Sequence, residues 1–243
     1  MMSLTGKVVL ITGGGTGIGK AIAQSFAADG AQVVITGRRE TKLREVCDAL
    51  GTAAIRYYAA DVGDLAQVQT LVDWVTSEVG PIDILINNAG MNVLARRIHQ
   101  LQPADWERMV QVNATGVYNT IYAVLPQMRE RQDGLLITIS SIAGVRASIL
   151  AGAGYSASKH AVNALMTVIG LEEKDHGIRV TTICPGEVNT PILDERPVPV
   201  SAEHKARILQ PEDVAAAALF VAKLPPRANV PELIIKPTTQ EFA

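Results

Sequence analysis

Cysteine and histidine are scarce in this chain, and neither residue type forms a cluster. The two cysteines, Cys47 and Cys184, lie far apart and make no CxxC pair. This usage argues against a disulfide framework and indicates a reducing setting such as the cytosol. The four histidines are scattered through the sequence, so their spacing predicts no metal site.

The chain also lacks a large excess of charge and any long apolar run. Its formal net charge is −2 at pH 7, which gives no bulk electrostatic argument for binding nucleic acid or an anionic membrane. No apolar run approaches the roughly 20 residues of a membrane span. The N-terminal residues lack the apolar core of a signal peptide. We therefore expect a soluble, cytoplasmic protein whose partner is a small molecule, with no nucleic acid and no membrane.

What the sequence has in quantity is apolar core. Hydrophobic residues make up 48% and charged residues 19% of the 243 positions, which is typical of one well-buried globular domain. Short apolar runs alternate with segments of helical periodicity from one end to the other. The runs predict strands at residues 8–11, 32–37, 55–60, 84–86, 135–139, 179–184 and 232–235. The segments between them predict helices, among them 40–50, 65–79, 104–131 and 212–223. This alternation predicts a single α/β domain over residues 1–243, with a Rossmann-type, doubly wound parallel sheet flanked by helices.

The first strand runs into a glycine-rich turn and then into a helix. Backbone N–H groups of such a turn, together with the helix N-terminus, can approach a pyrophosphate. The candidate residues are Gly13, Thr16, Gly17, Ile18 and Gly19, and the last glycine also permits close packing of helix on strand. A flexible loop is the plainer interpretation of a glycine cluster, but the order strand, turn, helix favours phosphate binding.

The end of the second strand indicates which dinucleotide is bound. An acidic residue here would bind the adenosine ribose hydroxyls, but the sequence has Gly37 followed by Arg38 and Arg39. The carboxylate that would repel a 2′-phosphate is missing, and two guanidinium groups that can bind it are present. We therefore predict NADP(H) in preference to NAD(H). For one of the two arginines, covering the start of the next helix is a credible alternative role.

Other candidates follow the carboxyl ends of later strands, where doubly wound sheets bind their ligands. Asp61 and Val62 follow the third strand, and Asp61 is either a partner of the adenine amino group or a solvated loop aspartate. Further candidates at this edge are Asn88, Ala89, Gly90, Ser141, Pro185 and Gly186.

Tyr155 and Lys159 are four residues apart in a segment predicted to be helical, so they lie on one face. A phenol titrates near pH ~10 in water. A neighbouring ammonium lowers that pKa and prepares the phenol for proton exchange with an alcohol or carbonyl oxygen. An isolated Tyr-x-x-x-Lys is more often an ordinary helix face, so this interpretation depends on the other motifs.

Residues 186–211 interrupt the alternation with repeated prolines among apolar and charged residues. Long irregular segments inside compact domains are often lids, so we predict a mobile cover over the substrate. Cations that could recognise a substrate carboxylate or phosphate are Arg146, Arg196, His204, Lys205 and Arg207. An apolar wall is expected from Val93, Leu94, Val145, Ile149, Leu150 and Ile192. Solvated loop charges explain each cation equally well, so the substrate stays open.

Taken together and in order, these motifs resemble the short-chain dehydrogenase/reductase family over nearly the whole chain. Thr12-Gly13-x-x-x-Gly17-x-Gly19 is similar to the family's cofactor turn, and residues 87–90 to its strand-four motif. Residues 185–190 resemble its Pro-Gly-x-x-x-Thr segment at the nicotinamide, which adds Val188 and Thr190 to the cofactor candidates. The family's catalytic tetrad is matched by Asn113, Ser141, Tyr155 and Lys159.

The resemblance implies a reversible oxidoreductase of secondary alcohols and carbonyls that transfers hydride to or from nicotinamide. Ser141 would hold the substrate oxygen, and Tyr155 would exchange the proton. Lys159 would lower the tyrosine pKa and bind the nicotinamide ribose, and Asn113 would hold a relay water. Relatives commonly form oligomers through their central helices, which implies a homotetramer or a dimer.

Two details qualify the resemblance. Many NADP-using relatives have a basic residue where this chain has Thr16, so the NADP prediction depends on Gly37, Arg38 and Arg39. The C-terminal segment lacks the glycine-rich ending of many acyl-carrier-protein ketoreductases, and is closer to NADP-dependent 3-hydroxy-acid or serine dehydrogenases.

Two other functions remain in view. A catalytically silent NADP(H)-binding sensor or scaffold would keep the glycine turn but lose members of the tetrad, and all four are present. An epimerase or dehydratase of the longer related family would need a C-terminal substrate domain and a different glycine spacing.

Overall fold

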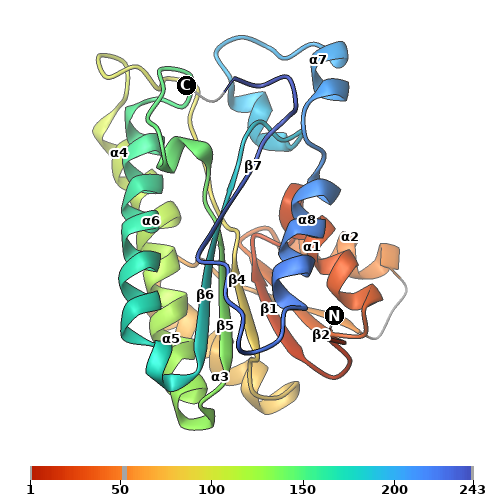
Figure 1. Ribbon diagram of the computed structural model, residues 1–243. Coiled ribbons are helices and arrows are strands. Elements are labelled where there is room, and N and C mark those ends of the chain that lie inside the picture. The colour runs from red at the N-terminus through yellow and green to blue at the C-terminus, as the bar shows by residue number, and fades with distance from the viewer. Residues whose placement is uncertain (1, 51–53, 242–243) are drawn as a thin grey trace.

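Seven short apolar segments form one parallel sheet, with the strand order β3-β2-β1-β4-β5-β6-β7 (Figure 1). The structure is a computed structural model, and it describes residues 2–50 and 54–241. The strands are β1 (Val8–Thr12), β2 (Gln32–Gly37), β3 (Ile55–Ala59), β4 (Ile84–Asn87), β5 (Gly134–Ile139), β6 (Ile178–Pro185) and β7 (Glu232–Ile235). The central strands are buried along their whole length, as expected of a sheet that is covered on both faces.

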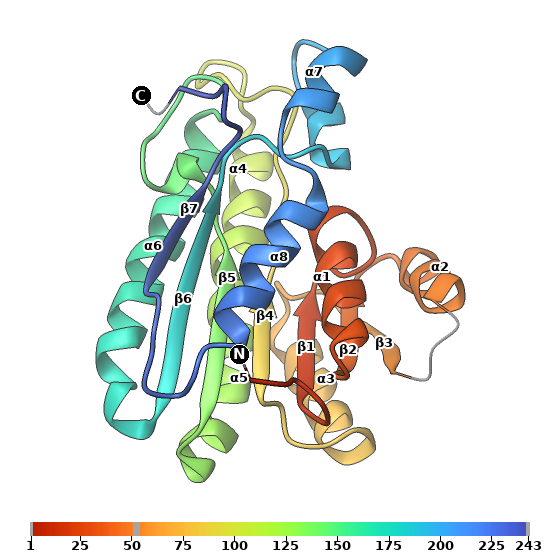
Figure 2. The ribbon, with the colours of Figure 1, turned by 45° about the vertical axis from the view of Figure 1, so that its right-hand side comes forward.

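Helices cover the two faces of the sheet in separate layers (Figure 2). One layer consists of α1 (Gly17–Ala28), α2 (Glu40–Leu50) and α8 (Pro211–Ala222). The other consists of α3 (Leu65–Glu78), α4 (Pro103–Val110), α5 (Gly116–Arg131) and α6 (Ala153–Glu172). Each layer buries its own apolar cluster against the sheet, so the sheet separates two cores.

The predicted fold class is confirmed, and the element bounds agree closely. Strand β2, helix α2 and strand β7 begin and end at the predicted residues, and β7 lies at an edge of the sheet. The other predicted strands differ by one or two residues at their ends. These segments are well predicted because their apolar runs are bounded by glycine, proline or charged residues.

The predicted helix at residues 104–131 is continuous but changes its winding in the middle. A π-helical turn, Gln111–Thr115, separates α4 from α5 and contains Asn113. The Asn113 side chain is fully buried and bonds the backbone of Met91 on both sides, accepting from its N–H at 2.8 Å and donating to its carbonyl at 2.9 Å. Single π turns of this kind occur frequently at functional sites.

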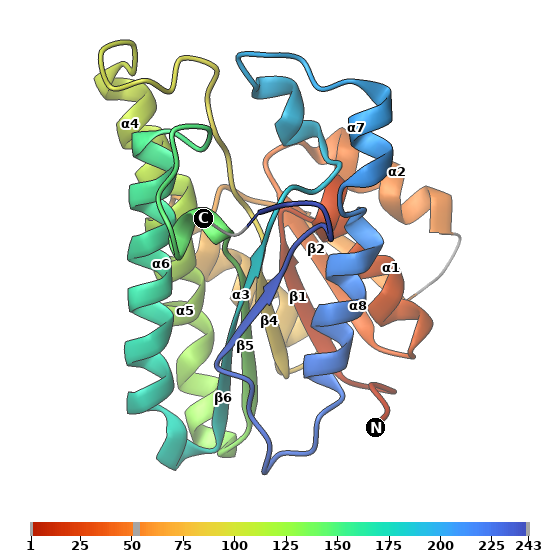
Figure 3. The same cartoon turned by 45° about the horizontal axis from the view of Figure 1, so that its top comes forward.

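Residues 186–211, which we call the cover, contain two short helical pieces, η4 (Pro191–Glu195) and α7 (Ala202–Arg207). The two ends of the cover meet, because Asn189 N–H donates to Leu209 O at 2.8 Å and Leu209 N–H donates to Glu187 O at 3.1 Å. Figure 3 shows this segment above the carboxyl ends of the strands, across from the loop that leads to α4.

Within residues 2–50 and 54–241, no helix is long and apolar enough to cross a membrane. The same residues contain no group of three or more histidine, cysteine or acidic side chains placed to hold a metal ion. Cys47 and Cys184 are both free thiols.

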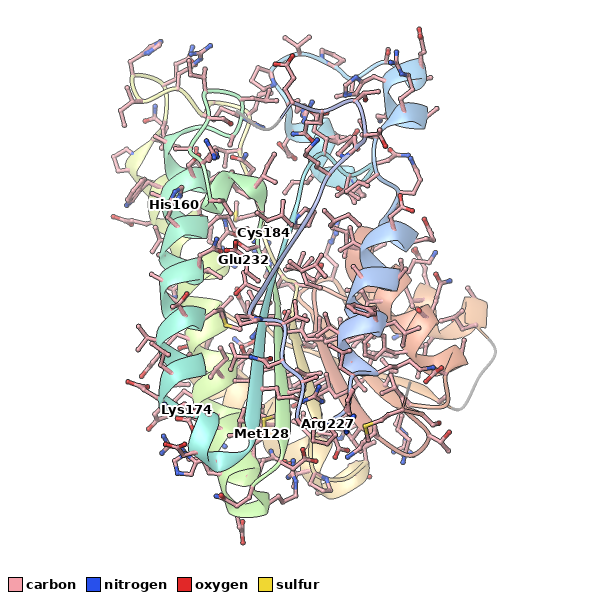
Figure 4. All side chains as sticks on the ribbon, in the orientation of Figure 1. Met128, His160, Lys174, Cys184, Arg227 and Glu232 are labelled. Carbon is pink, nitrogen blue, oxygen red and sulfur yellow. The ribbon has the colours of Figure 1, made fainter. Side chains whose placement is uncertain are left out.

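The buried carboxylate of Glu173 joins the ends of α5 and α6. Its side chain is 1% exposed, and it accepts a hydrogen bond from Arg129 Nε at 2.8 Å and a second from the same guanidinium. The bonded Arg129 holds the pKa of this carboxyl below its usual value. Figure 4 labels the nearby Lys174 and Met128, which lie at the end of the molecule opposite the cover.

We expect Glu173→Gln to lower the free energy of unfolding by about 1–3 kcal/mol at neutral pH, because a charge-assisted, two-pronged contact is lost. Since the folded-state pKa is lowered, the stabilisation is complete above the ordinary value of 4.5 and is lost as the pH falls. Urea unfolding should therefore show a gap between wild type and variant that is constant down to about pH 5 and shrinks as the pH falls from 4.5 to about 3. Glu172→Gln, at an exposed neighbour, is the control. A gap that stays constant over this range would contradict the prediction.

Candidate active site

A cavity of about 680 Å³ lies at the carboxyl ends of the strands, beneath the cover. Its size is that of a typical small-molecule site. The residues predicted from sequence that line it are Gly13, Thr16, Gly17, Ile18, Arg38, Arg39, Asp61, Val62, Asn88, Ala89, Gly90, Ser141, Tyr155, Lys159, Pro185, Gly186, Val188 and Thr190. Gly19 and Asn113 are predicted site residues that do not line it.

The glycine turn brings the N-terminus of α1 to the cavity wall. Thr16 is the residue before the helix, and its side chain caps none of the helix N–H groups. The first turn of α1 also contains no acidic residue. Gly17 has φ = +52°, and a Cβ there would lie 3.1 Å from a methyl of Thr190 in the cover. The uncapped N–H groups of this turn can therefore bond an anionic ligand.

Gly19 is a packing residue in this structure. A Cβ at this position would lie 2.3 Å from Gly13 O and 2.5 Å from the amide nitrogen of Asn88. The Asn88 amide in turn donates to Thr12 O at 3.0 Å and Gly13 O at 3.1 Å. The glycine thus lets α1 approach the turn, and Asn88 holds the turn in shape from β4.

Three cations line the cavity at the end of β2. Arg38 and Arg39 lie where the sequence predicted, and Lys42 from the first turn of α2 joins them. Lys42 donates to the Glu45 carboxylate at 2.7 Å, so its charge already has a partner. At the end of β2, Arg38 and Arg39 are therefore better placed than Lys42 to bind a phosphate of the ligand.

Asp61 already has protein partners for its carboxylate. It accepts from Arg108 Nη2 at 2.5 Å and from Gly63 N–H at 2.9 Å. Burial acts to raise the pKa of this carboxyl, but the bond from Arg108 and the bond from Gly63 bring it below its usual value. Arg108 belongs to α4 and was not among the sequence candidates, because only the folded chain brings it to β3. An adenine contact at Asp61 stays a prediction.

Tyr155, Ser141 and Lys159 meet at the inner wall of the cavity, beside the ends of β5 and β6. Tyr155 and Ser141 both line the cavity, and the Ser141 side chain acts to lower the pKa of Tyr155. Lys159 Nζ lies 5.7 Å from the centroid of the Tyr155 ring and donates to Ile139 O at 2.9 Å. A Cβ at Gly90 would lie 3.7 Å from this ammonium, so the β4 motif forms the opposite side of the pocket.

The pKa values differ from the sequence-based expectation in one respect. We expected Lys159 to lower the pKa of Tyr155, but burial raises that pKa, and the groups that oppose the rise are Ser141 and Arg96. Lys159 is itself buried, and burial lowers its pKa to about 8. The expectation was wrong because a spacing of four residues says nothing about how far both groups are removed from water.

Asn113 supports the site from outside the cavity. Besides its two bonds to Met91, its amide donates to the Ser158 hydroxyl at 3.0 Å. Ser158 directly precedes Lys159 on α6. Asn113 therefore joins the loop after β4 to the helix that carries Tyr155 and Lys159.

Two residues that the sequence did not single out also line the cavity. Gln240 accepts from Glu187 N–H at 3.0 Å, so the C-terminal segment supports the start of the cover. Arg96, from the loop after β4, is 6% exposed. Its place in the loop that follows the carboxyl end of β4 is the sequence signal that could have identified it.

The predicted substrate-facing residues are only partly found at the cavity. Of the five cations, Arg196 lines it, while the lining does not include Arg146, His204, Lys205 or Arg207. Of the predicted apolar wall, Leu150 and Ile192 line it, whereas Val93, Leu94, Val145 and Ile149 do not. These residues lie in irregular loops, where side chains follow no helical or strand periodicity. The sequence therefore did not predict which of them face the cavity.

The family of this chain is established by comparison with known proteins. A model described as short chain dehydrogenase matches residues 7–198. The chain belongs to this family. An uncharacterized oxidoreductase of Staphylococcus aureus (strain MW2) is 35% identical over 237 residues, which cover 98% of this chain and 100% of the relative. The protein is therefore an oxidoreductase of the short-chain dehydrogenase family.

Solved structures of the family are closely similar. Serine dehydrogenase in a closed form with NADP⁺ has a TM-score of 0.87 and 33% identity, and the match covers 97% of each chain. An alcohol dehydrogenase of the archaeon Thermococcus sibiricus with 5-hydroxy-NADP has a TM-score of 0.86 and 28% identity, covering 97% of this chain and 98% of that one. The likeness to serine dehydrogenase agrees with the sequence-based subgroup.

Proposed function

We propose that this short-chain dehydrogenase interconverts a secondary alcohol and a carbonyl with NADP(H). The observation that carries the proposal is that Tyr155, Ser141 and Lys159 line the same cavity. The uncapped N–H groups of α1 and the side chains of Arg38 and Arg39 line another part of it. The scarcity of cysteine supports a cytoplasmic location for this activity.

The cofactor would be held beyond the ends of β1, β2 and β4 and by helix α6. The N–H groups at Gly17 and Ile18 suit the pyrophosphate, and Arg38 and Arg39 suit the 2′-phosphate of the adenosine ribose. Lys159, beside Gly90, suits the hydroxyls of the nicotinamide ribose. The nicotinamide, when bound, supplies or accepts the hydride.

The protein's own groups handle the substrate oxygen and its proton. The Ser141 hydroxyl holds the oxygen, and Tyr155 donates its proton as charge develops there in the reduction. Because burial raises the pKa of Tyr155, the phenol keeps its proton at neutral pH and is an acid in the reductive direction. Lys159 then returns a proton from solvent to Tyr155, by way of the relay water that Asn113 would hold.

The cover would enclose the substrate above this group. Its contact between Thr190 and Gly17 brings it to the cofactor turn. Arg96 donates to the backbone carbonyl of Glu195 in the cover, from the opposite wall of the cavity. Enclosure excludes water from the reacting atoms and strengthens the electrostatic interactions there.

The test is a titration of the full chain with NADPH and with NADH, followed by a panel of aldehydes and ketones monitored by nicotinamide absorbance. We expect tighter binding of NADPH and turnover of at least one carbonyl. Tighter binding of NADH would show that the end of β2 was misinterpreted. Tight NADPH binding without turnover of any carbonyl would favour the alternative of a silent sensor or scaffold.

We also propose a homo-oligomer, a tetramer or a dimer. Large apolar side chains are exposed on adjacent turns of the two long helices, Tyr118 and Tyr122 on α5 and Val168 and Leu171 on α6. Exposed apolar area of this kind marks an interaction surface. Sedimentation at micromolar concentration should give a mass of two or four chains, and Tyr122→Glu with Leu171→Glu should reduce it. A monomeric wild type would contradict the proposal.

A further inference from the structure

Arg96 is a buried cation that tertiary structure places in the wall of the cavity. Its guanidinium donates to three backbone carbonyls, those of Val93 at 3.0 Å, Leu150 at 2.9 Å and Glu195. These carbonyls belong to three separate segments, the loop after β4, the approach to α6 and the cover. The guanidinium is therefore fixed in direction by backbone atoms on three sides.

Arg96 forms no ion pair within 4.0 Å among the described residues, and the Glu195 carboxylate acts on its charge only from farther away. The other cavity-lining arginine beside it differs, because Arg196 pairs with Glu187 at 3.3 Å. Backbone carbonyls bear only partial charge, so burial lowers the pKa of Arg96. The nearby charge of Arg196 adds to this lowering, while Glu195 and Tyr155 oppose it only in part. A buried charge without a counterion is costly, and a ligand anion would remove that cost.

The guanidinium also has unused donors that such an anion requires. An arginine carries five N–H groups. Three of them are used by the three carbonyls, so two remain for a ligand within the described part of the chain. Two N–H groups in one plane match the two oxygens of a carboxylate.

Arg96 lies near the reacting end of the cavity. Its charge acts on Tyr155, where it opposes the rise of the phenol pKa. Its side chain packs on Gly152, where an added Cβ would lie 2.6 Å from the Arg96 Cβ, and Gly152 immediately precedes α6 with Tyr155 in its first turn. Arg38 and Arg39 lie at β2, which β1 and β4 separate from β5. Arg96 therefore lies apart from Arg38 and Arg39 along the sheet, and can bind a different anionic group.

We propose that Arg96 binds the carboxylate of the substrate, so that the enzyme acts on oxo acids and the corresponding hydroxy acids. This inference rests on the proposed function and names its substrate class. In the reduction, the carbonyl carbon accepts hydride from the nicotinamide and its oxygen accepts the proton of Tyr155, which solvent restores. The carboxylate is unchanged and serves to orient the carbonyl against Tyr155 and Ser141.

The test measures kcat/KM with NADPH for 2-oxo, 3-oxo and 4-oxo acids, each beside its methyl ester, in wild type, Arg96→Gln and Arg97→Ala. Arg97 is the exposed neighbour in the same loop and is the matched control. We expect wild type and Arg97→Ala to prefer the acid over its ester by about 10–100-fold at one chain length, as for a charged hydrogen-bonded pair. In Arg96→Gln that ratio should fall close to one, because KM rises more for the acid than for the ester.

Equal rates for acid and ester in wild type at every chain length would overturn the proposal. So would an Arg96→Gln variant that loses acid and ester activity equally, because this outcome indicates that Arg96 only ties the three segments together. Arg96→Lys keeps the charge and should restore part of the preference for the acid if charge recognition is the role.

A binding measurement separates this inference from the proposed function. Propanoate and butanoate, which cannot be reduced under these conditions, are titrated into the NADP⁺ complexes of wild type and Arg96→Gln, with thermal unfolding as the readout. A carboxylate-dependent rise in unfolding temperature that is lost in Arg96→Gln supports the anion site even if no carbonyl is reduced. Equal responses of the two proteins contradict it even if carbonyls are reduced.

Discussion

Tyr155→Phe should lower kcat for carbonyl reduction by about 10²–10⁴-fold, the usual contribution of a positioned acid. The substitution removes one hydroxyl group from a half-buried ring and leaves the ring's packing intact. NADPH affinity should change little, because the ribose and phosphate contacts proposed above do not use this hydroxyl. Stopped-flow hydride transfer and NADPH titration measure the two quantities separately.

Tyr122→Phe is the matched control for this substitution. Tyr122 is exposed on α5, stacks with Tyr118 at 5.8 Å between ring centroids, and does not line the cavity. The control should retain the activity of the wild type. A Tyr155→Phe enzyme with more than about a third of the wild-type kcat would exclude Tyr155 as the acid and would direct attention to Lys159 or Ser141.

Replacing Arg38 and Arg39 together by alanine should weaken NADPH binding by about 10²-fold or more and NADH binding only slightly. Each charge-assisted bond to the 2′-phosphate contributes roughly 1.5–3 kcal/mol, and only NADPH carries this group. The single variants should show which arginine makes the larger contact. Fluorescence titration with both cofactors, repeated at high salt, provides the measurement.

Arg44→Ala is the control for the arginine variants. Arg44 lies on the same helix as Lys42 but bonds Glu40 at 3.0 Å, and it does not line the cavity. Its loss should leave both affinities unchanged. Equal weakening of NADPH and NADH in the double variant would show that the arginines support the loop and do not select the phosphate.

The fold was predictable because its strands and helices are marked by local chemistry. A fully apolar run such as residues 84–86, bounded by Asp83 and Asn87, has few alternatives to a buried strand. The helix at residues 40–50 was placed correctly because its polar face is continuous and its apolar residues repeat at helical spacing. The π turn at Asn113 was not predictable, since side-chain bonds to a distant loop hold it.

The candidate site was predictable where a motif is continuous in sequence. The turn at residues 13–19 and the pair Tyr155 and Lys159 needed only the order of elements and helical spacing. Arg96, Arg108 and Gln240 were missed, because each acts on a segment at least 47 residues away, as in the bond from Arg108 to Asp61. Loops give no periodic signal from which such meetings can be inferred.

The sequence by itself determined the alternation of strands and helices, the glycine turn, the basic end of β2 and the helical spacing of Tyr155 and Lys159. Only the tertiary structure decided the ionisation of that pair, since burial, which depends on the whole fold, raises the pKa of Tyr155 and lowers that of Lys159 to about 8. It also placed Arg96, a buried cation, in the wall of the cavity that Tyr155 lines. Apolar periodicity is a local property, whereas burial and charge pairing depend on segments that meet only after folding.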